Sequence, residues 1–257
     1  MWFFGLLLLA ASGGLLYGHR SKQRKLGLIA STEVCTVDHL RQLAASMTEG
    51  LGPGSLHFGA AVSGTVRCDE PLTAELSGVP SVHYTMSVHR EREEQREARS
   101  SGGETQTQQT SDQLTQQTQS VRFTLEDATG RLEVDPAGAT FTAEQTISRL
   151  EPAADGGQSL RLGTFAMDVS NPPPTTEGRT VGYRFREQAI PVGHEVFILG
   201  EVTDPDGELR MARPADGQLL ISVKNRDQLL READSGSKFM RRAAIVCGVL
   251  GLLLLIL

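Results

Sequence analysis

Two uncharged apolar runs flank a longer and more polar region of the chain. Residues 1–17 and 243–257 carry no charged side chain and are dominated by Leu, Ala, Ile, Val and Phe. As helices, the stretches 2–17 and 243–257 are about 24 and 22 Å long at about 1.5 Å per residue, against a hydrocarbon core about 30 Å thick. Both runs are predicted to be transmembrane helices, the first with Trp2 and Tyr17 as interfacial aromatic residues.

Each run has an alternative interpretation. The first could be a cleaved signal peptide, but a signal peptide carries its basic residues before the apolar run. Here four basic residues follow it instead: Arg20, Lys22, Arg24 and Lys25. The second run could be a buried core helix, but such a helix would show a polar stripe and 243–257 has none. The pattern therefore favours a membrane segment at each end.

The charges beside these runs predict a topology. The basic linker 18–35 follows the first segment, and Lys238, Arg241 and Arg242 precede the second within the flank 238–257. Because basic residues favour the cytoplasmic side, residues 18–242 are predicted to be cytoplasmic, with both termini outside. The expected location is an integral membrane protein with two spans, in the plasma membrane if the source is prokaryotic.

The region between the anchors has the periodicity of a β-rich domain. Alternating apolar and polar residues predict strands at 58–66, 82–88, 121–125, 131–134, 181–186, 195–203, 208–211 and 218–222. Thr36 is placed to cap a helix over 37–48, and a second helix is predicted at 224–233 with Leu229 and Leu230 on its apolar side. The predicted fold over 36–237 is α+β, a mainly antiparallel β domain with flanking helices, anchored by an N-terminal and a C-terminal transmembrane helix.

Residues 91–120 break the alternation. Gln, Thr, Glu and Arg dominate this stretch, and Ala98 and Leu114 are its only apolar residues. Such a composition cannot bury a core of its own, so the stretch is either a solvated loop or the extended tip of a hairpin. It is also a candidate surface for a partner.

Composition excludes several classes of protein. The chain has 25 basic and 31 acidic residues and a net charge of −6, whereas nucleic-acid binders usually present a basic face. Its three cysteines are too few for a disulfide scaffold or a multi-zinc module. In a cytoplasmic domain Cys35 and Cys68 are expected to be reduced thiols, and Cys247 is expected to pack within its membrane segment.

No catalytic or metal-binding constellation emerges from the motifs. The chain contains no G-x-S-x-G elbow, no phosphate-binding loop and no H-E-x-x-H sequence. His83 and His89 can share a strand face, but at about 20 Å apart they cannot bind one ion. Cys68 is expected to be an ordinary half-buried thiol, and Asp127, Asp204 and Asp206 fall in turns. We therefore predict no catalytic residue, no metal ligand and no cofactor.

The order of the segments suggests a family. Between the two membrane segments come GTVRCDEPLTAELSGVPSVHYTMSVHRE, VRFTLEDATGRLEVDPAGA, GYRFREQAIPVGHEVFILGEV and QLLISVKNRDQLL. This order resembles the GIDE-type, or "beside a membrane", domain of the mitochondrial RING-type ubiquitin ligase MULAN and its prokaryotic relatives, over about residues 28–257. In the ligases a RING follows the second membrane segment. A RING needs eight Cys or His ligands, so three cysteines with no C-x-x-C pair imply a member without one. The richness in Arg, Ala and Gly and the apolar C-terminus fit a prokaryotic-like member.

The expected function is a non-catalytic binding or scaffold module, doubly anchored in the lipid bilayer. Its protein partner is unknown and is expected to contact the β edges or residues 91–120. One alternative is a ubiquitin ligase by homology, with zinc or a RING supplied in trans. Another is an envelope-stress or membrane-organising protein that contacts lipid through the basic flanks. No nucleic-acid partner is expected, and the oligomeric state is left open.

Overall fold

The computed structural model describes residues 27, 29–52, 54–97, 105–153, 159–169 and 179–232. The predicted membrane segments 1–17 and 243–257 lie outside these residues, as does Cys247. Within the described part of the chain, no helix combines the length and the apolar character needed to cross a bilayer. The described residues are mostly strand, which confirms the predicted β-rich fold.

The first sheet closes on itself. Its strand order is β1-β5-β6-β13-β12-β14-β7, and β1 also pairs with β12, so five strands form a ring that β14 and β7 extend. Its strands are β1 (His57–Arg67), β5 (Phe123–Glu126), β6 (Arg131–Val134), β7 (Thr140–Thr142), β12 (Glu195–Thr203), β13 (Arg210–Ala212) and β14 (Leu220–Ser222). The strand pairs are antiparallel except β13–β6 and β14–β7, which are parallel.

The ring encloses the larger hydrophobic core. Alternate residues of each strand point inward, so Val62, Leu125, Leu132 and Ile198 are fully buried. Helix α2 (Val37–Leu51) covers this core with Val37 and Leu40. It begins at the capping residue Thr36 and ends at Gly52, whose φ of 89° few other residues adopt.

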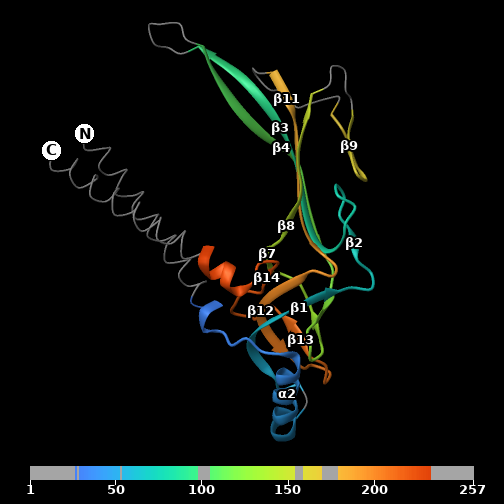
Figure 1. The fold of residues 1–257 in the computed structure, drawn as a ribbon, viewed down its shortest axis with the longest axis vertical. Coiled ribbons are helices and arrows are strands. Elements are labelled where there is room, and N and C mark those ends of the chain that lie inside the picture. The colour runs from blue at the N-terminus through green and yellow to red at the C-terminus, as the bar shows by residue number, and fades with distance from the viewer. Residues whose placement is uncertain are drawn as a thin grey trace, which may run out of the picture.

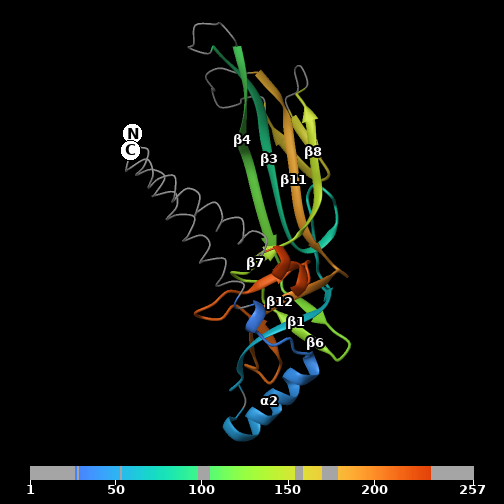
Figure 2. The same cartoon turned by 60° about the vertical axis from the view of Figure 1, so that its left-hand side comes forward.

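The second sheet rises away from the end of the molecule that carries α2 (Figure 1 and Figure 2). Its strands are β2 (Leu72–Thr73), β3 (Pro80–Glu97), β4 (Thr105–Ser120), β8 (Glu144–Pro152) and β11 (Arg179–Pro191). The order is β2-β3-β11-β8, with β4 also paired to β3. The hairpin of β9 (Ser159–Leu162) and β10 (Phe165–Asp168) packs with Tyr84, Met86 and Phe185 in a second hydrophobic core.

Strands β3 and β11 belong to both cores. Val82 and Ile190 lie in the first core, and Tyr84 and Phe185 lie in the second. The two strands pair from Ser81 to Glu93 and from Arg179 to Pro191, with register shifts near each end. This pair therefore joins the closed ring to the projecting sheet.

Glu187 is a buried charge in the middle of β11. Its carboxylate accepts hydrogen bonds from the backbone N–H groups of Leu76 (2.7 Å) and Ser77 (3.2 Å) and from the Thr146 hydroxyl (2.8 Å). It is fully buried, where a charge is tolerated only with such partners. Glu187 thus fastens both the turn before β3 and the irregular pairing of β8 to β11.

Most predicted elements are found, several with shifted bounds. The helix predicted at 37–48 extends to Leu51, and the strand at 195–203 is β12. Residues 226–232 are helical, and Leu229 and Leu230 form the apolar side as predicted; they pack against a cluster that contains Phe197. The strand predicted at 208–211 begins two residues later, as β13. Of the two interpretations of 91–120, the hairpin is correct, since β3 continues to Glu97 and β4 starts at Thr105.

Replacing Glu187 tests whether it organises this junction. Glu187→Ala leaves the buried Leu76 N–H and the half-buried Ser77 N–H without an acceptor, so it is expected to lower the free energy of unfolding by about 3 kcal/mol in chemical denaturation. Gln188→Ala, one residue along but exposed, is the matched control and is expected to change it by about 0.5 kcal/mol or less. Equal effects of the two variants would contradict the role given to Glu187.

Candidate functional site

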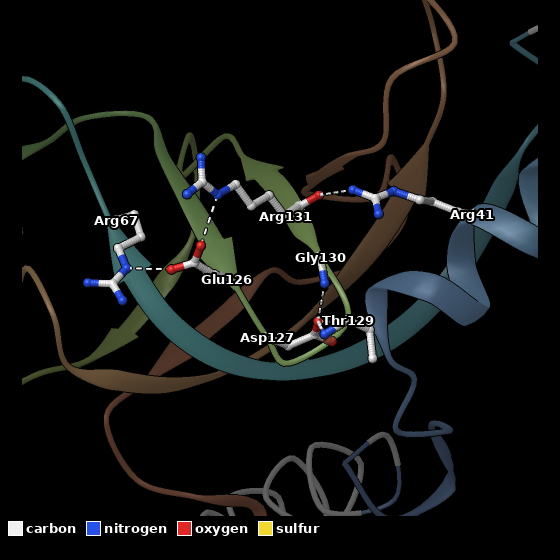
Figure 3. Close-up of polar contacts among 7 residues, drawn as sticks. All are labelled: Arg41, Arg67, Glu126, Asp127, Thr129, Gly130 and Arg131. Atoms are coloured by element: carbon white, nitrogen blue, oxygen red, sulfur yellow. Dashed lines mark hydrogen bonds and ion pairs between the residues drawn. The ribbon is translucent and has the colours of Figure 1, made fainter.

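A single carboxylate organises the turn between β5 and β6. Asp127 Oδ1 accepts hydrogen bonds from the backbone N–H groups of Thr129 (2.7 Å) and Gly130 (2.8 Å) and from the Thr129 hydroxyl (2.7 Å) (Figure 3). The Asp127 N–H also donates to the Gly130 carbonyl at 3.0 Å. The segment Asp-Ala-Thr-Gly is a common turn sequence because aspartate accepts from backbone groups that follow it.

The same turn fastens the N-terminus of α2. Asp127 Oδ2 accepts from the Val37 N–H at 2.8 Å, and the Thr129 hydroxyl oxygen accepts from the Asp38 N–H at 3.0 Å. The third N–H of the helix, from His39, donates to the Thr36 hydroxyl at 3.3 Å. The first N–H groups of a helix have no partner within it, so here they are satisfied largely by residues about 90 positions away.

The charge of Asp127 suits this position. Burial raises the pKa of Asp127, but hydrogen bonds from Val37, Thr129 and Gly130 outweigh burial and hold the pKa below its usual value. The carboxylate also faces the positive end of the helix dipole. Asp127 therefore remains ionised and acts as a structural clamp between the hairpin and α2.

Arginines surround the clamp (Figure 3). Glu126 lies between Arg67, whose Nε is 2.7 Å from Oε2, and Arg131, whose Nε is 2.9 Å from Oε1. These two hydrogen bonds hold the pKa of Glu126 below its usual value. Arg41, from α2, donates to the Arg131 carbonyl at 3.4 Å and lies where a Cβ at position 130 would clash, so Gly130 leaves room for it.

A groove of about 780 Å³ lies between α2 and the β5–β6–β13 side of the ring. Its lining residues are Arg41, Ala44, Ala45, Thr48, Thr124, Arg131, Glu133, Asp204, Gly207, Glu208 and Leu209. Asp204 is buried and accepts from the Leu56 N–H at 2.9 Å, which gives it a structural role. The lining offers ionic and hydrogen-bonding groups but no His, Cys, Ser or Lys.

The histidines weighed as metal ligands are not brought together. His83 is 3% exposed, and its ring stacks on Phe141 with 3.6 Å between the ring centroids. Its Nδ1 lies 2.8 Å from the Ser120 hydroxyl, and burial lowers the pKa of His83 to about 4. His89 lies further along β3 and is half-buried. Among the described residues, neither belongs to a group that could share a metal ion.

The cysteines occupy different environments. Cys68 directly follows β1, is half-buried, and has its Sγ 3.7 Å from the Arg122 carbonyl oxygen. Cys35 is buried against the first core. Its Sγ lies within 4.8 Å of ligand atoms of Glu33 and His39, and this is the one such group among the described residues. Scanning for paired Cys or His motifs misses this mixed set, whose sequence signal is E-x-C-x-x-x-H.

The outer edge of β4 is the second candidate surface. Over its length β4 pairs with β3, and no described strand pairs with its other edge. Asp112 is the single charged residue of β4, and it is paired internally with Arg92 (Nε to Oδ2, 2.8 Å) and Arg90 (Nη2 to Oδ2, 3.1 Å). These contacts, with the Arg92 hydrogen bond the strongest, lower the pKa of Asp112. The exposed edge is therefore polar but almost free of unpaired charge.

The described residues thus form a β-rich domain with two candidate surfaces, a groove beside α2 and the outer edge of β4. A model of the GIDE family, described as E3 Ubiquitin ligase, matches residues 90–256, which is more than half of the chain. The chain belongs to the GIDE family, which confirms the resemblance drawn from the order of its segments.

Two curated relatives are plant ubiquitin ligases. The chain is 30% identical to E3 ubiquitin-protein ligase SP1 of Arabidopsis thaliana over 225 residues, 86% of this chain and 60% of the relative. It is 24% identical to E3 ubiquitin-protein ligase SPL1 of the same plant over 204 residues, 76% of this chain and 54% of the relative. The chain therefore spans a little over half the length of these relatives. No solved structure matches it.

Removing the Asp127 carboxylate tests the clamp. Asp127→Ala leaves the Val37 N–H and the turn without their acceptor, so the free energy of unfolding is expected to fall by about 2 kcal/mol. Amide exchange in α2 should also accelerate. Glu126→Ala is the matched control, because its arginine partners are largely exposed, and it should leave α2 exchange unchanged. If α2 exchange is the same in Asp127→Ala and wild type, the clamp does not hold the helix.

His83 gives the fold a pH dependence. Its folded-state pKa of about 4 lies below the ordinary 6.5, so between these values the unfolded chain binds a proton that the folded chain does not. Stability should therefore fall by about 3 kcal/mol as the pH falls through this window. Denaturation of His83→Gln from pH 7 to 4 should lack that contribution, whereas His89→Gln should retain it. If the stability of His83→Gln fell with pH as steeply as that of the wild type, another group would be responsible.

Proposed function

We propose that this chain is a non-catalytic binding module of a ubiquitin-ligase-related protein, held at a membrane by residues 1–17 and 243–257. Its membership of the GIDE family and its similarity to two ubiquitin ligases support the first part. The uncharged apolar runs at the two ends support the second. Recognition of a protein partner is the role assigned to the described domain.

The outer edge of β4, with which no described strand pairs, is the observation that carries this proposal. An exposed strand edge presents a row of unpaired backbone N–H and C=O groups, and an extended peptide can add to it as a further strand. The β4 edge is 16 residues long, well above the usual strand length of about 5–6 residues. Natural proteins commonly protect such edges with Lys, Pro or short strands, and β4 contains neither Lys nor Pro.

The β4 strand is also held in a regular shape. It pairs with β3 from Ser120 to Thr105, with one register shift near Leu114. Leu114 packs against the second core, and Asp112 forms ion pairs with two buried arginines. Because the edge is pre-ordered, a partner that pairs with it loses only its own conformational freedom.

The transfer of ubiquitin is not assigned to the residues of this domain. A RING takes eight Cys or His ligands for two zinc ions, and the three cysteines of these 257 residues form no C-x-x-C pair. In this proposal the module selects the partner, and a RING outside these residues or on another protein promotes the transfer of ubiquitin to it.

Site-specific photo-crosslinking in native membranes tests the proposal. A photoreactive benzoylphenylalanine is placed at Gln109, exposed on β4, and in a matched control at Gln42, exposed on α2. Crosslinking to one discrete protein is expected at position 109 and not at position 42. An excess of the purified protein without a photoreactive residue should reduce this crosslinking. Equal crosslinking at both positions, or none at position 109, would contradict recognition through β4.

A further inference from the structure

The segment before α2 places two potential ligands on one side of an extended chain. Val34 forms a parallel bridge with Ala61, with the Cys35 N–H donating to the Ala61 carbonyl at 2.8 Å and the Ala61 N–H donating to the Glu33 carbonyl at 3.0 Å. In an extended backbone, side chains two residues apart point the same way. The side chains of Glu33 and Cys35 therefore lie together, opposite the exposed Val34.

The start of α2 adds a third ligand. Thr36 has an extended conformation and turns the chain into the helix, whose first turn carries His39. The ligand atoms of Glu33, Cys35 and His39 all lie within 4.8 Å of one another. A bridge, a capping residue and one helical turn thus bring together a carboxylate, a thiol and an imidazole.

We propose that Glu33, Cys35 and His39 bind one Zn²⁺ ion, with water as the fourth ligand. Zn²⁺ is bound in proteins by thiolate, imidazole and carboxylate, and three protein ligands with one open position is a recurrent arrangement. This site is independent of partner recognition through β4.

The distances suit this assignment after a small movement. Zn–ligand bonds of about 2.0–2.3 Å in a tetrahedron place the ligand atoms about 3.3–3.8 Å apart. The present separations, up to 4.8 Å, require the ligand atoms to close by about 1.5 Å or less. Glu33 and His39 are exposed, and no described residue hydrogen-bonds to either side chain, so rotation of these two side chains can close the site.

Cys35 gives up only one weak contact of its thiol when it binds the ion. It is 5% exposed, and its Sγ makes one long contact, donating to the Glu33 carbonyl at 3.8 Å. A bound ion would displace the thiol proton, and the thiolate and the Glu33 carboxylate would together balance its two positive charges.

A bound ion would reinforce the N-terminus of α2. Residues 33–35 precede the helix, and the next residues, Val37 and Asp38, are those fastened by the β5–β6 turn. The ion would tie the chain that leads from the predicted linker 18–35 to the same helix terminus.

Cobalt substitution of the full chain tests the site, because a thiolate ligand gives Co²⁺ a near-ultraviolet charge-transfer band. The reduced, chelator-treated protein is titrated with Co²⁺ and then with Zn²⁺. One equivalent of Co²⁺ should produce the band, and one equivalent of Zn²⁺ should abolish it. His39→Gln and Glu33→Gln, which alter exposed side chains, should weaken binding roughly tenfold or more, and Cys35→Ser should remove the band.

Cys68→Ser is the matched control and should bind Co²⁺ as the wild type does. Circular dichroism of each variant establishes that it is folded, and His39→Gln provides the decisive comparison if Cys35→Ser does not fold. Absence of the band from the wild-type protein would overturn the proposal. So would loss of the band in Cys68→Ser, or wild-type affinity in both His39→Gln and Glu33→Gln.

Discussion

The antiparallel pairing of β3 with β11 is the constraint on which the rest of the structure depends. These two strands contribute Val82 and Ile190 to the core of the closed ring and Tyr84 and Phe185 to the core of the second sheet. Where the strands leave the ring, the buried Glu187 carboxylate accepts hydrogen bonds from backbone N–H groups of the turn that precedes β3. A slip of one residue in this pairing would reverse the faces of both strands and disrupt both cores.

That pairing determines which surfaces the domain exposes. Because β3 is long and fixed at its base, it supports β4 along a shared register far from the ring. The opposite end of the molecule is closed by α2, which the Asp127 carboxylate holds against the ring. The fold thus combines a base capped by α2 with a projecting sheet (Figure 2), and no described strand pairs with the outer edge of its edge strand β4.

Local patterns in the sequence predict the strands that bury one face. Alternation identifies residues 195–203 because every second side chain enters the core, and the capping hydroxyl of Thr36 marks the start of α2. Strand β4 has no such pattern, since its Gln and Thr residues become strand through pairing with β3. The contacts of Asp127 with α2 and the parallel pairing of β6 with β13 join distant segments, which periodicity cannot reveal. Proximity of Glu33, Cys35 and His39 likewise depends on the turn at Thr36.

The central claim is that β4 is an ordered strand with one edge free for a partner. Residue-resolved hydrogen exchange of the full chain tests it most directly, because backbone amides alternate in direction along an antiparallel strand. The account predicts that amides of 105–120 directed toward β3 are protected and that the intervening amides exchange rapidly. Protection of every amide would show that the edge is already covered, and rapid exchange of every amide would show that β4 is not held by β3. Either result would contradict the claim.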